Sequence, residues 1–150
     1  MVNRGIRGYQ TGLLLDNLDA HLYGDAVDQI VLLIGTNDIG KEVELEQTLH
    51  NIEAVIQSIA RDFPLTQIKL LSILPVNEGT EYQQTVYIRT NEKIKAWNQA
   101  YQDLASAYMQ VEYIPVFDSL LDEAGQLKPT YTTDGLHLSV AGYQVLSKVL

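Results

Sequence analysis

The sequence contains no cysteine, which excludes disulfides, thiolate metal sites and cysteine nucleophiles. Basic residues are also few: 10 Lys and Arg stand against 19 Asp and Glu, which gives a formal net charge of −9. A phosphate backbone and an anionic membrane surface would both be repelled by that charge. We therefore expect no nucleic-acid partner.

Long apolar runs are absent as well, because no run approaches the ~18 residues of a membrane span. The first residues, Met-Val-Asn-Arg-Gly, do not form the apolar region of a signal peptide. A cytoplasmic location is therefore the default expectation, although a signal upstream would change it. The 150 residues, 46% hydrophobic and 19% charged, are ordinary for a globular protein, and we expect a single domain over residues 1–150.

Apolar patterning predicts strands that alternate with amphipathic helices. The strands are expected at 1–6, 29–34, 68–74 and 111–116, and the helices at 11–22, 44–61, 88–108 and 140–150. Residues 29–34 form a continuous apolar run, which is typical of a parallel strand buried on both faces. Thr11 and Ser139 are the predicted N-caps of the first and last helices. This order predicts a three-layer α/β/α fold with a parallel sheet, in which function lies at the carboxyl ends of the strands.

Three short clusters lie in connections where such a site is expected. They are residues 3–11 (NRGIRGYQT), residues 35–38 (GTND) and residues 134–137 (DGLH). Taken singly, each has a purely structural interpretation. Gly8 suits a turn with positive φ, Asn37 and Asp38 suit a turn or a helix cap, and Asp134 with His137 suits a surface pair.

Taken together and in this order, the three clusters resemble the SGNH (GDSL-type) hydrolases, and most closely the branch similar to platelet-activating-factor acetylhydrolases. Gly8 matches the family's Gly block, Asn37 its Asn block, and Asp134 with His137 its last block. The resemblance implies a flavodoxin-like three-layer fold and a serine esterase that acts on small acyl esters, acetyl esters above all. It implies neither a metal nor an organic cofactor. Oligomeric state stays open, a homodimer included.

The chemistry of ester hydrolysis fits these residue types. A tetrahedral oxyanion needs hydrogen-bond donors fixed at about 3 Å, which the backbone N–H of Gly8 and the side chain of Asn37 can supply. His137 would take the proton from a serine and return it to the leaving alcohol. Asp134 would hold the tautomer of His137 and stabilise its charged form.

The family's Gly-Asp-Ser block, which carries the nucleophile, is missing. None of the six serines stands in that context, so we expect no nucleophile within residues 1–150; they are Ser58, Ser72, Ser106, Ser119, Ser139 and Ser147. By resemblance, the missing strand would lie in the middle of the sheet, between residues 1–6 and 29–34. We therefore expect this chain to be a fragment, or the product of a mis-set start, with the nucleophilic serine upstream of Met1.

Two other functions remain open at this point. The first is a catalytically inactive remnant, or a domain of the same fold that binds a ligand or partner, because the nucleophile is missing. The second is a flavodoxin-like binder of flavin or nucleotide, although the sequence has no phosphate loop of the G-x-G-x-x-G or Walker type. The polar connection at 76–86 is expected to shape the pocket, and Arg4 and Arg7 to be solvated surface residues. Trp97, Tyr101 and Tyr108 are expected to pack in or at the rim of the core.

Overall fold

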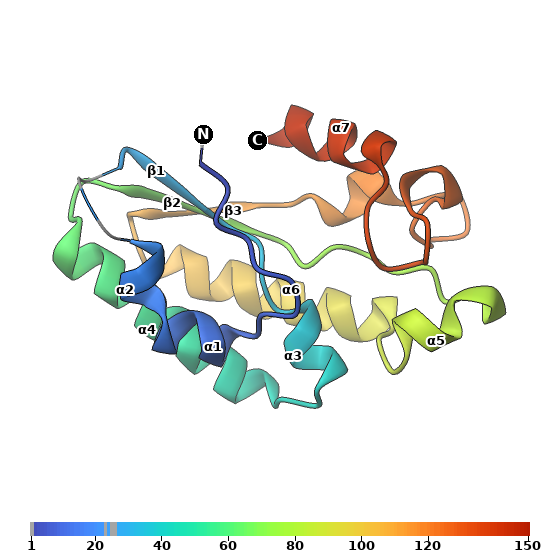
Figure 1. Ribbon diagram of the computed structural model, residues 1–150, viewed down its shortest axis with the longest axis horizontal. Helices are drawn as coiled ribbons and strands as arrows, with labels where there is room; N and C mark the ends of the chain where they lie inside the picture. The colour runs from blue at the N-terminus through green and yellow to red at the C-terminus, as the bar shows by residue number, and fades with distance from the viewer. Residues whose placement is uncertain (1, 23, 25–26) are drawn as a thin grey trace.

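A three-stranded parallel sheet forms the centre of the molecule (Figure 1). The computed structural model describes residues 2–22, 24 and 27–150. The strands are β1 (Gln29–Leu32), β2 (Gln67–Leu71) and β3 (Val111–Ile114), in the spatial order β1-β2-β3. Each strand pairs in parallel with the next, with Ile30 opposite Ile68 and Leu70 opposite Tyr113.

Helices cover both faces of this sheet, which confirms the predicted α/β/α layering (Figure 1). On one side lie α1 (Thr11–Asp16), α2 (Leu18–His21), α4 (Leu45–Asp62) and α6 (Asn91–Ser106), while α3 (Thr36–Gly40) and α5 (Gln83–Val86) lie beyond the ends of the strands. On the other face lies α7 (Val140–Val149). Short 3₁₀ turns lie in the connections: η1 (Thr80–Tyr82), η2 (Phe117–Leu120) and η3 (Pro129–Tyr131).

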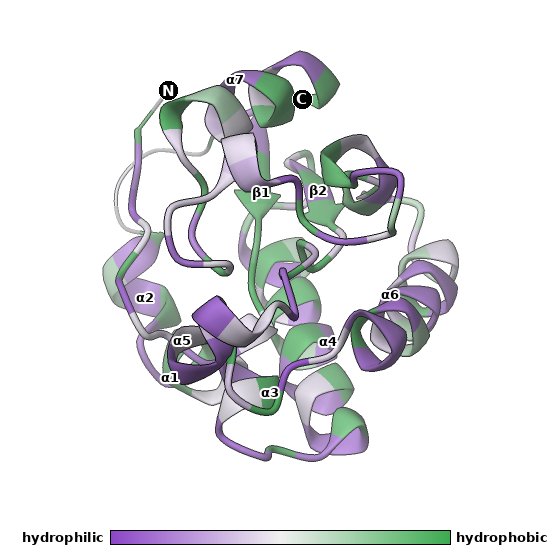
Figure 2. Ribbon diagram, turned by 90° about the vertical axis from the view of Figure 1, so that its right-hand side faces the viewer, coloured by the Kyte–Doolittle hydropathy of each residue, from purple (hydrophilic) through white to green (hydrophobic). Residues whose placement is uncertain are grey.

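Two hydrophobic cores form on the two faces of the sheet. The larger lies between the sheet and the long helices α4 and α6, where Ile56 and Tyr101 are fully buried. The smaller packs Leu71 and Ile114 against Leu146 of α7. Figure 2 shows β1 and β2 as hydrophobic segments between these layers. The strands therefore owe their position to burial of alternate side chains in two separate cores.

The long helices follow the predicted pattern closely. On α4 the apolar positions recur at helical spacing, and Ile52, Ile56 and Ile59 are buried. The helix ends at Asp62, two residues before Pro64, which disfavours helical geometry at the residue before it. At the start of α7, the hydroxyl of Ser139 accepts a hydrogen bond from the N–H of Gly142, as predicted for an N-cap.

The predicted strand at residues 1–6 is wrong. Met1 lies outside the described residues, and residues 2–6 are exposed and form no strand. The predicted burial of residues 29–34 on both faces is wrong too, because Val31 and Leu33 are 39% and 43% exposed. In the described part of the chain β1 pairs only with β2, so its other edge is unpaired and residues 2–6 do not extend the sheet.

The predicted helix at 11–22 is split in two at Asn17. The Asn17 amide donates to the carbonyl of Leu13, a local bond that competes with continuation of the helix. The prediction of Thr11 as an N-cap is wrong. Gln10 occupies that position, without a side-chain cap bond, and the Thr11 side chain bonds to Asp38 instead.

The predicted helix at 88–108 begins three residues later, at Asn91. Its N-cap is Thr90, whose hydroxyl accepts from the N–H of Lys93 at 3.2 Å. Trp97 and Tyr101 are buried in the core and Tyr108 packs at its rim, as expected. The connection predicted at 76–86 contains two short helical elements, η1 and α5.

Candidate active site

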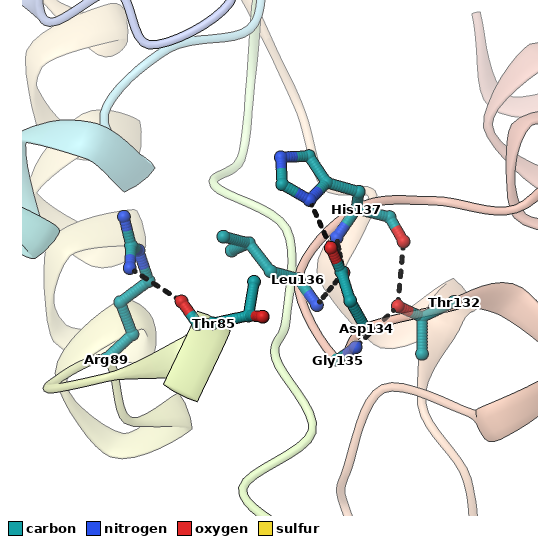
Figure 3. A network of polar contacts seen from close by, with 7 residues as sticks. All are labelled: Thr85, Arg89, Thr132, Asp134, Gly135, Leu136 and His137. Carbon is teal, nitrogen blue, oxygen red and sulfur yellow. Dashed lines mark hydrogen bonds and ion pairs between the residues drawn. The ribbon is translucent and has the colours of Figure 1, made fainter. Parts of the chain in front are cut away.

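Asp134 and His137 form a direct pair in the last connection before α7. The Nδ1 atom of His137 lies 2.7 Å from Oδ2 of Asp134, and this contact is drawn as a dashed line in Figure 3. Its other oxygen accepts from the backbone N–H groups of Leu136, at 3.0 Å, and of His137, at 2.8 Å. The Asp134 carboxylate therefore holds both the backbone of residues 136–137 and the imidazole ring of His137.

These contacts set the charge state of Asp134. Partial burial by itself would raise the pKa of its carboxyl, but the hydrogen bonds from the backbone and ring of His137 and from Leu136 outweigh it. The pKa of Asp134 therefore lies below its ordinary value. An ionised Asp134 accepts a hydrogen bond from Nδ1–H, and in that tautomer Nε2 carries the lone pair that can accept a proton. That second nitrogen lies on the side of the ring away from Asp134 (Figure 3).

The loop that carries this pair is held by its own backbone. The Thr132 hydroxyl donates to the carbonyl of His137 at 2.7 Å and accepts from the N–H of Gly135 at 2.9 Å (Figure 3). Gly135 has a φ of +81°, and a Cβ atom there would lie 2.6 Å from Cβ of Tyr82. Its carbonyl accepts from the N–H of Asn77 at 2.9 Å. The loop is thus tied to the segment that leaves β2.

Two asparagines on α6 hold that segment in place. The Asn98 amide accepts from the N–H of Ile73 at 2.7 Å and donates to the carbonyl of the same residue at 2.9 Å. Asn91 makes the equivalent pair with Val76, at 2.8 and 2.7 Å. Residues seven apart lie on one face of a helix, so both amides meet the same extended backbone. Nothing in the apolar pattern predicts this contact, since both positions read only as polar residues within a helix.

Gly8 and Asn37, the predicted oxyanion donors, are joined through Tyr9. The Asn37 amide nitrogen donates to the carbonyl of Tyr9 at 3.0 Å. Because an amide carries two hydrogens, this bond leaves one of them for another acceptor. Gly8 has a φ of +81°, as expected of a turn glycine, and its N–H donates to no group in the described part of the chain.

Asp38, interpreted from the sequence only as a turn or cap residue, clamps the same two clusters together. Its fully buried carboxylate accepts the hydroxyl and the backbone N–H of Thr11, the latter at 3.2 and 3.1 Å from its two oxygens. The hydroxyl of Thr48 lies 3.4 Å away, and Asn51 donates to Thr11 at 3.0 Å. The clamp joins the end of the Gly8 turn to the first turn of α3.

The turn between β1 and α3 also requires a glycine. Gly35 has a φ of +123°, and a Cβ there would lie 2.2 Å from the hydroxyl oxygen of Tyr101. That hydroxyl donates to the carbonyl of Ile34 at 3.1 Å. Burial, and after it the charge of Asp38, raises the pKa of Tyr101 well above its ordinary value, so the phenol stays a donor.

The serines do not complete a triad within these residues. Ser72 is buried just beyond β2, where its oxygen accepts from the N–H groups of Val116 and Phe117. The hydroxyls of Ser106, Ser139 and Ser147 donate to nearby backbone carbonyls. Although all six serines are described, none hydrogen-bonds to the ring of His137. Within the described residues there is also no group of three or more His, Asp or Glu side chains arranged to hold a metal ion.

The family model for GDSL-like lipases and acylhydrolases matches residues 1–145. The chain belongs to this GDSL-like lipase/acylhydrolase family. No match to a curated protein was found.

Solved structures agree with membership in the GDSL-like family. A Streptococcus pneumonia protein, provisionally described as a platelet activating factor, is 78% identical with a TM-score of 0.98, over 99% of this chain and 70% of that one. A provisionally described acylhydrolase from Bacteroides fragilis is 21% identical with a TM-score of 0.84, over 99% and 71%. A GDSL-like lipase from Bacteroides thetaiotaomicron is 22% identical with a TM-score of 0.82, over 99% and 72%. The GDSL-like chain thus spans about seven tenths of each of these proteins.

Over residues 2–22, 24 and 27–150, no helix has the length and apolar character needed to cross a bilayer.

Proposed function

We propose that this chain supplies the acid–base and oxyanion parts of a serine ester hydrolase for small acyl esters, and that the nucleophilic serine comes from residues preceding Met1. The observation that carries the proposal is the pair of His137 and Asp134, at 2.7 Å, in a chain of the GDSL-like family. The lowered pKa of Asp134 supports a carboxylate that stays ionised while the ring gains and loses a proton.

The reaction would follow the usual course of acyl transfer. His137 Nε2 removes the proton of the serine hydroxyl as the serine oxygen bonds to the ester carbonyl carbon. The tetrahedral intermediate then expels the alcohol, which takes the proton from His137. Water, activated by the same ring, hydrolyses the acyl-serine and releases the acid. Asp134 remains a carboxylate throughout and holds the imidazole in the required tautomer.

Two donors would stabilise the intermediate. The N–H of Gly8 and the second amide hydrogen of Asn37 are the groups assigned to the oxyanion. The loss of one such donor typically costs about 2.7–4 kcal/mol of transition-state stabilisation. The Asp38 clamp supports the assignment, since it joins the two segments that carry these donors.

Small acyl esters, with acetyl esters first, are the proposed substrates. Support comes from the sequence resemblance to the acetylhydrolase-like branch and from the likeness to the Streptococcus pneumonia protein. The alternative is an inactive domain of the same fold that binds a ligand or partner. The absence of any bond between the six serines and His137 favours that alternative for these 150 residues taken alone.

The test compares two proteins: the 150-residue chain, and the same chain preceded by the in-frame codons upstream of Met1. Each is treated with a fluorophosphonate probe and assayed with p-nitrophenyl acetate. We expect labelling and hydrolysis from the longer protein alone, and their loss in its His137→Ala variant. The control is His50→Ala, because His50 is exposed and lies on α4.

Either of two results would contradict the proposal. One is a longer protein that folds yet takes no label. The other is full hydrolysis by the His137→Ala variant. An unlabelled protein that still binds an acetyl ester would establish the alternative.

A further inference from the structure

Arg89 is a buried cation whose hydrogen bonds, among the described residues, all go to uncharged groups. The residue is 8% exposed. Nε donates to the carbonyl of Thr36 at 2.9 Å and approaches the hydroxyl of the same residue at 3.2 Å. Nη1 donates to the carbonyls of Val86 and Thr85, at 3.2 and 3.4 Å. In the described part of the chain no carboxylate forms an ion pair with it.

Stability alone gives no reason for a cation at this position. A charge removed from water without an opposite charge is costly, and burial lowers the pKa of the Arg89 guanidinium accordingly. Well-packed apolar side chains often replace buried charges with no loss of stability. The cost of a buried arginine therefore suggests that its hydrogen bonds place something that the site needs.

The group that Arg89 holds is the peptide unit that leads into Asn37. The carbonyl of Thr36 and the N–H of Asn37 belong to one planar unit, so a bond that fixes the carbonyl also fixes the start of Asn37. The side-chain amide of Asn37 is fixed separately, by the carbonyl of Tyr9 at 3.0 Å. Asn37 is thus held at its backbone by Arg89 and at its side chain by Tyr9.

The place of Arg89 is narrowly defined. A Cβ atom on Gly40, at the end of α3, would lie 2.1 Å from Nη2 of Arg89, so the guanidinium lies directly against the backbone of α3. On its other side it binds the last carbonyls of α5. The guanidinium therefore joins α5 to α3 by contacts that a smaller or less planar side chain could not reproduce.

The segment that ends in Arg89 also touches the acid–base loop. Tyr82 packs against Gly135, as the 2.6 Å approach of a Gly135 Cβ shows. In Figure 3, Thr85 and Arg89 lie on one side of Leu136, with Asp134 and His137 on the other. Between α5 and Arg89, Tyr87 has a φ of +57°, a strained conformation of the kind that recurs at functional sites. Residues 80–89 thus contact both halves of the candidate site.

We propose that Arg89 is a positioning residue for the oxyanion donor: through the Thr36 carbonyl it fixes the Thr36–Asn37 peptide unit, and with it the direction of the Asn37 amide. The inference rests on the proposed function, which gives Asn37 its role. It goes beyond that function by assigning the residue, and the segment 80–89, that hold the donor in place.

The test follows the Asn37 side-chain amide directly, so it needs no nucleophile. In the ¹⁵N-labelled 150-residue chain, its two amide protons are assigned by their loss in Asn37→Ser. In the wild-type chain we expect two well-separated signals, with slow exchange for the proton that bonds to Tyr9. In Arg89→Gln we expect the separation to collapse and exchange to accelerate about tenfold, as loss of one ordered hydrogen bond would give.

The controls separate positioning from folding. The Asn98 amide, bonded to Ile73, must keep its signals in every variant, which shows that the fold is intact. Arg61→Gln removes an exposed arginine that pairs with Asp62, and it must leave Asn37 unchanged. Arg89→Lys keeps the charge and one donor, and we expect exchange intermediate between wild type and Arg89→Gln. If Arg89→Gln loses the Asn98 signals too, the lysine variant decides the question.

Unchanged Asn37 signals in Arg89→Gln, or in Arg89→Lys where the glutamine variant does not fold, would overturn the inference. A second readout uses the protein extended upstream of Met1. There, Arg89→Gln should lower kcat about 10²-fold, near the lower end of the effect of losing an oxyanion donor, with KM changed less than about twofold. If the wild-type extended protein takes no fluorophosphonate label, the proposed function fails, while the amide signals still test the role of Arg89.

Discussion

The carboxylate of Asp38 accepts both the hydroxyl and the backbone N–H of Thr11, 27 residues earlier in the chain. This contact joins the turn that carries Gly8 to the helix that carries Asn37. Both residues are fully buried, so the bonds are protected from water. The two proposed oxyanion donors are therefore set relative to each other by a pair of residues that need not touch a substrate.

Replacement of Asp38 by Asn should break this clamp. The NH₂ group of the asparagine would face the N–H and hydroxyl of Thr11, which are themselves donors in the wild-type chain. Hydrogen bonds to a charged acceptor, such as those lost here, are worth roughly 1.5–3 kcal/mol. We expect the free energy of unfolding to fall by about 2–3 kcal/mol, measured by urea denaturation. Asp16→Asn, on the exposed side of α1, should change it by less than about 0.5 kcal/mol. Equal effects of the two substitutions would show that the clamp contributes nothing.

Asn98→Ala should destabilise the sheet although the residue lies on a helix. The substitution leaves the N–H and the carbonyl of Ile73 buried without partners, at about 1–3 kcal/mol each. We expect a loss of about 2–4 kcal/mol in the free energy of unfolding. Gln99→Ala, next to it and exposed, serves as the control and should cost less than about 0.5 kcal/mol. A small effect of Asn98→Ala would mean that water replaces the amide.

Gly135→Ala and Gly125→Ala form a matched pair. Both glycines have a positive φ, +81° and +75°, but only at Gly135 would a Cβ collide with a neighbour, Tyr82. The conformational penalty alone is about 1–2 kcal/mol. We expect Gly125→Ala to cost about that amount and Gly135→Ala at least ~1 kcal/mol more, by thermal or urea unfolding. Identical costs would show that Tyr82 moves aside freely.

The Asp134 carboxyl predicts a pH dependence. Its pKa is lower in the folded chain than in the unfolded one, so its contribution is present above the unfolded value of about 3.9 and is lost as pH falls through the folded value. Unfolding of the wild type and of Asp134→Asn should therefore differ at pH 6 and converge below pH ~4. The effect should be small because the side chain is partly exposed. A difference that grows toward low pH would contradict the assignment.

The uncovered edge of β1 predicts self-association of the 150-residue chain. Val31 and Leu33 are exposed beside a strand edge that no described segment pairs, and such edges template contacts between chains. We expect sedimentation to show oligomers at micromolar concentration, and Val31→Lys to reduce them. Leu65→Lys, at an exposed apolar position outside the three strands, should have no such effect. A wild-type chain that sediments as a monomer would contradict this prediction.

Sequence periodicity predicted the parts of the fold that burial determines. The stripe on α4 and the apolar runs of β2 and β3 each place side chains in a core, and each appears where expected. The strand at 1–6 failed because a local pattern carries no information about whether a neighbour is present. Thr11 failed as a cap because its hydroxyl has a stronger acceptor in Asp38, which is distant in sequence.

In the candidate site, too, contacts within a motif could be predicted from the sequence and contacts between distant segments could not. Asp134 and His137 are three residues apart, so their contact follows from the motif. The bonds of Asn91, Asn98 and Arg89 join segments 15 to 53 residues apart, and no periodic pattern encodes them. They become visible only when the partner backbone is in place, since an amide or guanidinium has many acceptors in principle and a single one in the fold.

The two asparagines of α6 pair with extended backbone in the way that a neighbouring strand would. Beyond Leu71 the backbone of residues 73 and 76 pairs with side chains of a helix, as it would otherwise pair with a neighbouring strand. A rotation or shift of α6 by one residue would therefore act as a register slip does in a sheet, and would displace Asn77 and the Gly135 carbonyl that it holds. The position of the acid–base loop therefore depends on the position of α6 along its own axis, through the segment 73–77.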